Sequence, residues 1–408
     1  MNRNRRSFLQ GLATLAGATT ATGASAQQGA PPTRADRPAR LSSGSVVPVV
    51  TPDVPFLPFT LDQGVKVFKL RAEPVKTEFV PGRRVDAWGF NGNIPGPTIE
   101  VTEGDRVRIV VENGLPEMFT PHWHGLEIPI EMDGVPGISQ PPIPPGGSFT
   151  YEFALRQNGT FFYHSHMAMQ EMMGMIGFFV VHPRAAHQPR VDRDFGLIMQ
   201  EWMILPYNTV PNTLAMEFNW LTLNGKAGPA TTPLVVKRGE RVRIRLVNLG
   251  MDHHPIHLHG NQFYVTGTEA GRAGGPFTMA ENTVLVGVGQ ARDVEFVAKY
   301  TGDWMLHCHL PHHMMNQMVS MVGPMMVPMN GTTGPGSTDP SRVPGFPQDM
   351  WVPADDLAGD KPELHGLPEN WSGAMMGMMT LVRVVEPDVF EEIERQRAER
   401  RAAIEANR

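Results

Sequence analysis

The 408-residue chain contains an internal repeat, and this repeat limits the possible folds more than any other feature of the sequence. Three segments of the first half return in the second half with closely similar residues. The first two return after 135 residues and the third after 143, so the second copy carries a net insertion of eight. The segments and their copies are 104–109 and 239–244, 122–125 and 257–260, and 159–166 and 302–309. A repeat of this length predicts two copies of one domain.

Each copy consists of short runs of strand-forming residues separated by turn residues. Residues 65–70 show an alternating pattern, and 106–111 are rich in β-branched side chains. The 42 glycines and 38 prolines fit a fold with many turns. We therefore predict an all-β fold with one β-sandwich at 58–188 and a second at 194–330.

The remainder, 331–408, is predicted to be a C-terminal extension. Residues 331–372 are rich in proline and glycine and indicate irregular structure. A strand is possible at 380–385. Residues 388–407 are expected to form a helix, with Glu391 four residues before Arg395. This helix is interpreted as a solvated surface or a subunit contact.

The N-terminus is typical of an export signal. Arginines at positions 5 and 6 precede an apolar stretch at 12–18 and a small-residue cleavage site at 24–26. This order predicts a twin-arginine signal peptide at 1–26, followed by a flexible leader at 27–57. We expect a periplasmic or secreted protein, exported by a bacterial twin-arginine system. No later stretch is long and apolar enough to span a bilayer, and the net charge of -6 disfavours a nucleic-acid partner.

Cys308, the only cysteine of the chain, is surrounded by potential metal ligands. His313 follows it by five residues and Met318 by ten. A thiolate, a weak axial thioether and two imidazoles form a blue copper site, so one more imidazole is needed. On a strand, Cys308 points to one face while His307 and His309 point to the other, so the tripeptide can serve two metal sites. A buried structural cysteine is the alternative, but an unpaired thiol in an oxidising compartment favours the metal site.

Four His-x-His pairs accompany this segment. Residues i and i+2 of a strand face the same way, so each pair offers two imidazoles on one face. The eight imidazoles, four from each copy, can hold three copper ions between the two domains. The pairs are His122 and His124, His164 and His166, His257 and His259, and His307 and His309.

Together these motifs resemble the multicopper oxidases, the laccase-like family, over residues 58–330. The resemblance implies cupredoxin-like Greek-key β-sandwiches and the reduction of O₂ to water by four copper ions per chain. It implies that His122 and His257 hold a type 2 copper. It implies a type 3 pair held by His124, His164, His166, His259, His307 and His309. It implies a type 1 copper held by His254, Cys308, His313 and Met318.

The internal repeat predicts that the type 1 site exists in the second domain alone. The first-domain equivalents of the four type 1 ligands are Phe119, Ser165, Gln170 and Met175. Three of the ligands are lost there, including the thiolate.

Five other histidines are assigned no ligand role. His253 and His312, which adjoin ligands, are expected at the surface or behind the ligands, and His182, His187 and His365 are expected to be structural or solvated.

Asp133 is a candidate catalytic residue. In similar proteins the acid of an Asp-Gly segment after the first histidine pair assists proton delivery; a turn aspartate is the alternative.

The three methionine clusters also allow two interpretations. The methionines at 167–175, 314–329 and 375–379 can bind cuprous ions or fill the core. Core filling is favoured for the middle cluster apart from Met318, and both interpretations stay open for the other two.

The sequence predicts an oxidase that takes single electrons from a phenol-type or metal-ion reductant and passes them through Cys308 to O₂. The main alternative is a metal oxidase acting on Cu(I), Mn(II) or Fe(II) in copper tolerance. A nitrite reductase is disfavoured because such enzymes carry their type 1 cysteine in the first domain. A copper-free interaction protein is disfavoured because no second-domain ligand is missing.

The distance between the two ligand sets along the chain predicts a shared site. Only 87 residues lie between His166 and His254, too few for a middle domain that would space the two faces. The first domain of one subunit is therefore expected to meet the second domain of the next. Similar two-domain oxidases close this contact into a ring of three, which implies a homotrimer with copper clusters at subunit interfaces.

Overall fold

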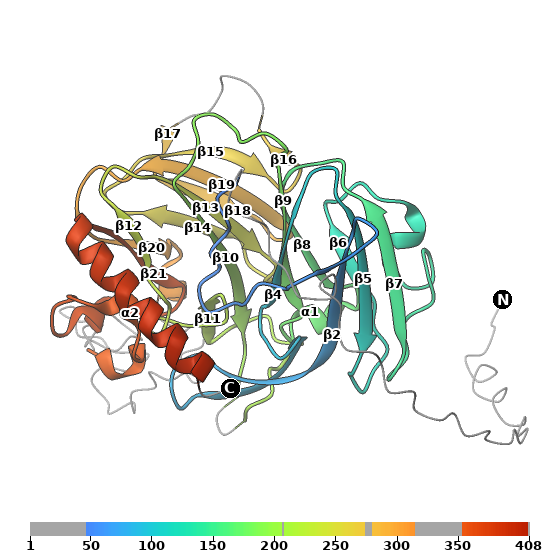
Figure 1. Ribbon diagram of the computed structural model, residues 1–408. Helices are drawn as coiled ribbons and strands as arrows, with labels where there is room; N and C mark the ends of the chain where they lie inside the picture. The colour runs from blue at the N-terminus through green and yellow to red at the C-terminus, as the bar shows by residue number, and fades with distance from the viewer. Residues whose placement is uncertain (1–45, 206–207, 274–279, 315–352, 407–408) are drawn as a thin grey trace, which may run out of the picture. The chain divides into compact units, whose positions relative to one another are not determined.

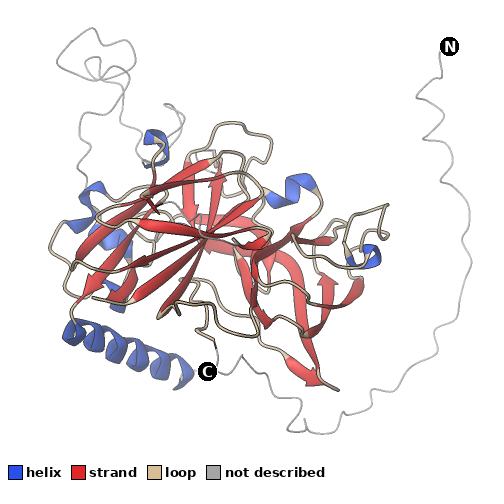
Figure 2. Cartoon of the chain, turned by 90° about the horizontal axis from the view of Figure 1, so that it is seen from above, coloured by secondary structure: helices blue, strands red, loops and turns tan. Residues whose placement is uncertain are grey.

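The computed structural model describes residues 46–205, 208–273, 280–314 and 353–406. These residues form two β-sandwiches and a C-terminal helix, which confirms the predicted all-β class (Figures 1 and 2). No helix within these ranges is long and apolar enough to cross a membrane.

The first sandwich consists of two sheets. One has the strand order β1-β2-β5-β7, with β3 also paired to β2, and the other has the order β4-β9-β8-β6. The strands are β1 (Thr60–Asp62), β2 (Val65–Glu78), β3 (Arg84–Phe90), β4 (Gly96–Thr102), β5 (Arg106–Asn113), β6 (Pro121–His124), β7 (Ser148–Ala154), β8 (Gly159–Ser165) and β9 (Ile176–His182). A 3-10 helix, η3 (Ile130–Met132), follows β6, and α1 (Ala168–Glu171) follows β8.

The second sandwich repeats this plan. One sheet has the order β11-β10-β13-β19-β15-β16, with β17 paired to β15, and the other has the order β12-β21-β20-β14-β18. The strands are β10 (Arg193–Trp202), β11 (Trp220–Leu223), β12 (Leu234–Lys237), β13 (Arg241–Asn248), β14 (His254–Leu258), β15 (Phe263–Thr268), β16 (Gly271–Arg272), β17 (Ala280–Glu281), β18 (Thr283–Val286), β19 (Gln290–Val297), β20 (Gly302–Cys308) and β21 (Met379–Val385). Short 3-10 helices are η4 (Pro311–Met314), η5 (Asp355–Ala358), η6 (Pro362–Leu364) and η7 (Trp371–Ala374).

Alternating apolar residues build the core of each sandwich. Every second residue of β5 is buried between the two sheets of the first domain, and the equivalent residues of β13 are buried in the second. These residues are Val107, Ile109 and Val111, and, 135 positions later, Val242, Ile244 and Leu246. The period of two predicts a strand that is buried on one face, and β5 has that form, whereas β13 is buried on both faces after Arg241.

The last strand of the second sandwich comes from the C-terminal extension. β21 pairs in parallel with β12 and antiparallel with β20, as β9 pairs with β4 and β8 in the first sandwich. A second-domain boundary at 330 therefore excludes a strand that the sheet contains, and the strand considered possible at 380–385 is real. The segment forms a strand of this sheet because every residue of β21 is buried in the sandwich.

The end of the expected leader is also ordered. Val50 forms a bridge with Phe195 of β10, and the Leu57 amide donates to the Thr98 carbonyl at 2.8 Å. Val49 and Leu57 are buried, and the burial of apolar side chains offsets the entropy lost on ordering this segment. A flexible leader through residue 57 is therefore wrong for 46–57. The proposed signal peptide lies outside the described residues.

The C-terminal helix α2 (Pro387–Ala406) lies along the second sandwich (Figure 1). Its first turns bury Phe390 and Ile393 against Val235 of β12 and Val385 of β21. The guanidinium of Arg193 lies 4.5 Å from the centre of the Phe390 ring. The helix predicted at 388–407 is confirmed, and these contacts attach it to the domain that β21 completes.

An apolar cluster joins the two sandwiches. Phe162 of β8 and Phe178 of β9 lie on the outer face of the first domain and pack with Ile198 of β10 and Val247 of β13. This contact therefore uses the sheet of the second domain that contains β10, β13 and β19.

A buried ion cluster lies at the same junction. Arg245 on β13 donates two 2.8 Å hydrogen bonds to Asp194 on β10, and a third of 2.6 Å to the hydroxyl of Thr160 on β8. Thr160 in turn donates to Asp293 on β19 at 2.5 Å. Burial raises the pKa of Asp194, but the charges of Arg245 and Arg243 outweigh it and hold the pKa below its ordinary value. The Asp194 carboxylate thus stays charged inside the protein because the two arginines neutralise it.

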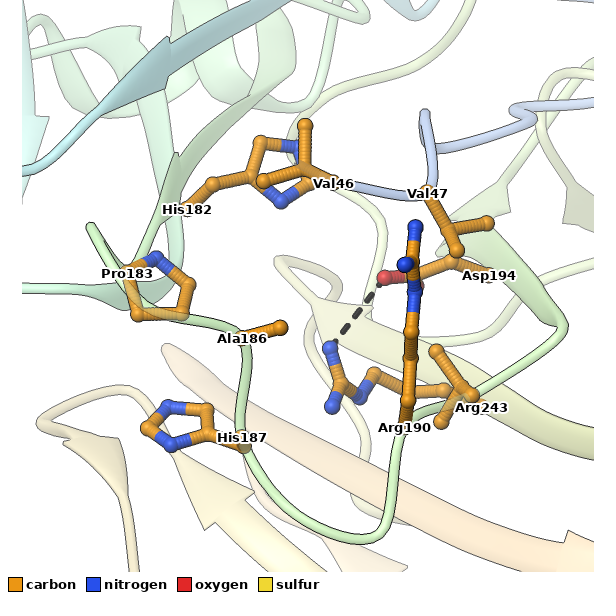
Figure 3. Close-up of a pocket in the computed structure, with 10 residues that line it drawn as sticks. Val46, Val47, His182, Pro183, Ala186, His187, Arg190, Asp194 and Arg243 are labelled. Atoms are coloured by element: carbon orange, nitrogen blue, oxygen red, sulfur yellow. Dashed lines mark hydrogen bonds and ion pairs between the residues drawn. The ribbon is translucent and has the colours of Figure 1, made fainter. Parts of the chain in front are cut away.

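A small cavity of about 30 Å³ lies beside this cluster, with Val46 and Val47 on one side (Figure 3). His182 and His187 contribute to its wall, and each has a protein partner. His182 Nε2 lies 2.8 Å from Glu100 Oε1, and His187 Nε2 lies 3.1 Å from Asn158 Oδ1. The geometry agrees with the structural roles expected of these two histidines.

The ion cluster makes Arg245 important for stability. Arg245→Leu leaves Asp293 buried without its cation and Asp194 with Arg243 alone, so we expect the free energy of unfolding to fall by about 3–5 kcal/mol at pH 7. Urea unfolding with an unchanged m-value measures the loss. The deficit should shrink below about pH 4, because an unpaired buried aspartate is then protonated at little cost. Arg71→Leu removes two exposed ion pairs instead, with Glu73 and Glu112, and should change stability by about 0.5 kcal/mol or less. Equal losses in both variants would contradict this account.

Candidate metal centre

Cys308 and two histidines converge in the core of the second sandwich. Cys308 Sγ lies 3.6 Å from His254 Nδ1 and 3.4 Å from His313 Nδ1, and the two nitrogens are 3.2 Å apart. Cys308 ends β20, His254 begins the neighbouring strand β14, and His313 lies on η4. All three side chains are fully buried. We call this group the cysteine site.

The donor atoms fit a trigonal metal ion. With bonds of about 2.0–2.3 Å to nitrogen and sulfur, trigonal ligands lie about 3.5–3.8 Å apart. The observed separations are close to this range, and two imidazoles with one thiolate are the equatorial ligands of a blue copper site. The chemistry and the spacing of the cysteine site therefore fit a type 1 copper.

Burial favours the neutral forms of Cys308 and His313. It raises the pKa of the Cys308 thiol to about 12. It also lowers the pKa of His313 to about 3, with a further contribution from the neighbouring His254. A metal ion must therefore displace the thiol proton, whereas the imidazole is already in its ligating form.

Two carboxylates adjoin the outer nitrogens of these imidazoles. Glu201 Oε1 lies 2.5 Å from His254 Nε2, and Asp252 Oδ2 lies 3.5 Å from His313 Nε2. Glu201 is buried at the end of β10 and accepts a 2.7 Å hydrogen bond from the Met251 amide. Carboxylates in such positions orient ligand histidines with the other nitrogen toward the metal. Sequence reasoning missed both residues, although Asp252 stands two positions before His254; Glu201 carried no readable signal.

The four first-domain histidines form a second group, which we call the first histidine set. His122 and His124 project from β6, His164 from β8, and His166 follows β8. His124 Nδ1 lies 3.3 Å from His164 Nε2, and the His122 ring centre is 5.4 Å from those of His164 and His166. Burial lowers the pKa of His124 to about 4, with help from the neighbouring histidines. Trp123, between the two histidines of β6, points into the core.

The second histidine set has the same design, with His257 on β14, His307 on β20, and His259 and His309 directly after these strands. His259 Nε2 lies 3.1 Å from His307 Nε2, and the His257 ring centre is 5.6 Å from those of His307 and His309. Burial lowers the pKa of both His259 and His307. The His-x-His pairs therefore share a face as strand geometry requires.

Backbone carbonyls orient equivalent histidines of the two sets. His122 Nδ1 lies 2.8 Å from the Asp133 carbonyl, and His257 Nδ1 lies 2.7 Å from the Asn282 carbonyl. His164 and His307 each place Nδ1 2.9 Å from the carbonyl of the following residue. With Nδ1 engaged in this way, Nε2 of each ring is available to a metal ion.

The structure does not bring the two histidine sets together. Among the described residues, each ring contact between a member of a histidine set and another histidine is made within that set. The first set lies on the sheet β4-β9-β8-β6 and the second on the sheet β12-β21-β20-β14-β18. Each set by itself offers four imidazoles.

The first domain satisfies its polar groups without a type 1 metal. Ser165 donates a 2.8 Å hydrogen bond to Gln170 Oε1, where the second domain has a cysteine and a histidine. Phe119 is buried in the apolar core at the position that corresponds to His254. These contacts fit the prediction that the first domain lacks this site.

Asp133 lies beside the first histidine set. Its carbonyl contacts His122, and its carboxylate Oδ1 lies 3.5 Å from the same His122 nitrogen. Gly134 follows with a φ of +84°, and a Cβ there would lie 1.7 Å from the Pro121 carbonyl oxygen. The Asp-Gly pair therefore makes a close turn against β6, and this turn holds a half-buried carboxylate next to a candidate ligand.

The structure describes most of the remaining candidates. Met172, Met175, Met375, Met378 and Met379 are buried, so they contribute to the core. Met169 is exposed, and Met318 lies outside the described residues. His253 is exposed and accepts a 3.1 Å hydrogen bond from the Val288 amide, away from the ligand atoms.

Comparisons with known proteins agree with this chemistry. Two family models, both described as multicopper oxidase, match residues 72–186 and 205–324. The chain belongs to the multicopper oxidase family, a family of copper-binding oxidoreductases, and has two cupredoxin domains.

Individual relatives match parts of the chain. It is 40% identical over 123 residues to copper resistance protein A of Pseudomonas syringae pv. tomato. The aligned residues are 30% of this chain and 20% of that protein. It is 32% identical over 239 residues to laccase-2 of Botryotinia fuckeliana, covering 53% and 40%. The crystal structure of a blue copper oxidase from Nitrosomonas europaea matches with a TM-score of 0.55 and 31% identity, covering 61% of this chain and 80% of that one. The chain spans between about a fifth and a half of the first curated relatives.

Proposed function

We propose that this protein is a laccase-like oxidase that takes single electrons from a reductant and reduces O₂ to water. The observation that carries the proposal is the segment 307–309. Cys308 belongs to the cysteine site, while His307 contacts the other members of the second histidine set. One strand therefore joins two candidate copper sites by covalent bonds.

The proposal assigns four copper ions to each chain. A type 1 ion belongs to the cysteine site, a type 2 ion to His122 and His257, and a type 3 pair to the other six histidines of the two sets. Bound copper supplies the one-electron redox chemistry and the place where O₂ is reduced. The protein orients the imidazoles through hydrogen bonds to backbone carbonyls, and it excludes solvent from the cysteine site by burial.

We further propose a homotrimer whose copper clusters lie between subunits. Within one chain, the two domains meet through β8 and β9 on one side and β10 and β13 on the other. The second histidine set lies on the other sheet of the second domain, on β14 and β20. The first set of one subunit would then face the second set of a neighbour, and three such contacts close a ring.

A metal-ion reductant is the second candidate. Asp252 is half-buried, and its carboxylate lies 3.5 Å from His313 Nε2 of the cysteine site. A carboxylate at this place attracts a cation such as Cu(I), and one relative is a copper resistance protein. Steady-state oxidation of phenols, Cu(I), Mn(II) and Fe(II) at equal copper loading separates the two candidates. Asp252→Asn should raise KM for the cations alone if the reductant is a metal ion.

The proposed location is outside the cytoplasm, because the twin-arginine motif and the cleavage site stand in the right order.

Two variants separate the two steps of the proposed function, oxidation of the reductant and reduction of O₂. Cys308→Ser should remove the blue colour of the copper-loaded protein and abolish oxidation of the reductant, because the thiolate is lost. His164→Ala should keep the colour, since the cysteine site is elsewhere, but should lose O₂ consumption. Visible absorption and an oxygen electrode measure both. A blue Cys308→Ser protein, or normal O₂ turnover by His164→Ala, would contradict the assignment.

Asp133 is proposed to assist proton delivery during O₂ reduction. Asp133→Asn keeps the carbonyl that contacts His122 but removes the proton-carrying carboxyl group. We expect O₂ reduction to slow by about 10²-fold or more, while the reductant still reduces the blue copper at the parent rate in stopped flow without O₂. An unchanged O₂ rate across the pH range would leave Asp133 as a turn residue.

The homotrimer is tested by mass and by dilution. Light scattering of the copper-loaded protein should give about three times the mass of one chain. Since each cluster would use two subunits, O₂ consumption per chain should fall at concentrations where the trimer dissociates. A monomer that remains fully active at high dilution would refute the shared cluster.

A further inference from the structure

The internal repeat continues beyond His313, after an interruption. Met-Met-Gly-Met at 172–175 returns as Met-Met-Gly-Met at 375–378, an offset of 203. Up to Met314 the offset is 143, so sixty residues are inserted between Met314 and Met375 in the second copy. By this alignment the second-domain equivalent of Met175 is Met378, whereas counting without the insertion gives Met318.

Strand pairing supports the longer offset. His164 of β8 pairs with Ile176 of β9, and His307 of β20 pairs with Met379 of β21. The parallel partners agree as well, since Ile99 pairs with Phe179 and Leu234 pairs with Val382. Each second-domain residue follows its first-domain equivalent by 135, 143 or 203 positions, according to its place in the chain.

The hydrogen bond next to the cysteine site is also repeated. In the first domain the Ser165 amide donates to the Met175 carbonyl at 3.1 Å, and in the second the Cys308 amide donates to the Met378 carbonyl at 3.0 Å. Helix α1, which follows Ser165, and η4, which follows Cys308, occupy equivalent positions. β21 therefore enters the sheet beside Cys308 as β9 enters beside Ser165.

Met378 is held between two residues of the cysteine site. Its amide donates to the His313 carbonyl at 2.9 Å, and its carbonyl accepts from Cys308. The side chain is fully buried in the same core cluster as Cys308. Gly377 permits this approach, because it has a φ of +67° and a Cβ there would lie 2.1 Å from the His313 carbonyl oxygen.

We propose that Met378 supplies the axial thioether of the type 1 copper, in place of Met318. The proposal rests on the proposed copper function, and it changes the fourth ligand from a residue ten positions after Cys308 to one seventy positions after it. The fourth ligand then directly precedes β21, the strand that pairs with β20 in this sheet. The alternative for Met378 is a core residue without a metal contact.

A pair of matched variants tests the proposal in the full-length, copper-loaded protein. Met378→Leu and Met318→Leu each remove one thioether at nearly constant volume, and Met175→Leu is the control at the equivalent first-domain position. An axial thioether lowers the reduction potential of a type 1 copper relative to a residue that does not ligate. The readouts are the visible and electron paramagnetic resonance spectra and a redox titration of the blue band.

We expect Met378→Leu to change both spectra and to shift the reduction equilibrium toward reduced copper by about tenfold or more, which is about 59 mV for one electron. Met318→Leu and Met175→Leu should match the parent. The reverse result, with Met318→Leu shifted and Met378→Leu unchanged, overturns the assignment. Equal parent-like spectra in both also overturn it. A parent protein that binds copper without becoming blue would instead contradict the type 1 site itself.

A second variant covers the case in which Met378→Leu does not fold. Met378→Gln keeps the length of the side chain and offers an oxygen, which serves as an axial ligand in some blue copper sites. Met378→Gln should change the electron paramagnetic resonance spectrum and should lower the reduction potential of the copper relative to the parent. X-ray absorption on Met318→Leu adds an independent measurement, because the long copper–sulfur contact should persist there. Loss of that contact in Met318→Leu refutes the proposal.

Discussion

The pairing of β20 with β14 on one side and β21 on the other is the constraint on which both candidate copper sites depend. Ile256 is opposite Cys308 and His257 is opposite His307, so the backbone ladder fixes which side chains share a face. Because neighbouring residues of a strand point to opposite faces, Cys308 faces the core while His307 turns away from it. A slip by one residue would exchange these faces and destroy both sites together. The metal chemistry therefore depends on ordinary sheet hydrogen bonds.

Burial gives each site its protonation state. The cysteine site has no contact with solvent, which raises the pKa of the Cys308 thiol and lowers the pKa of His313. The same desolvation affects His124 and His307 in the two histidine sets. Backbone carbonyls at Nδ1 of His122, His164, His257 and His307 then orient these rings. The protein thus prepares oriented donors, and copper binding at the cysteine site displaces the thiol proton.

The junction between the domains has a different chemistry from the sites. It combines an apolar cluster with arginines that neutralise buried carboxylates, and it draws on strands β10, β13 and β19. The second histidine set lies on the opposite sheet, so this junction leaves the two sets apart. In the proposed homotrimer, a contact made by another copy of the chain brings the eight imidazoles together.

The sequence by itself determined the repeat, the all-β class, the two domains, the C-terminal helix and the three residues of the cysteine site. These features are readable because strand periodicity and ligand spacing are local, and because the two copies can be compared directly. The tertiary structure decided what depends on contacts between distant segments. It brought Glu201 to His254, ordered 46–57 by burying apolar residues, and placed β21 next to β20. An insertion of sixty residues hides the last of these relations from any count along the chain, because hydrogen bonding between strands, not sequence distance, selects the residue that lies beside Cys308.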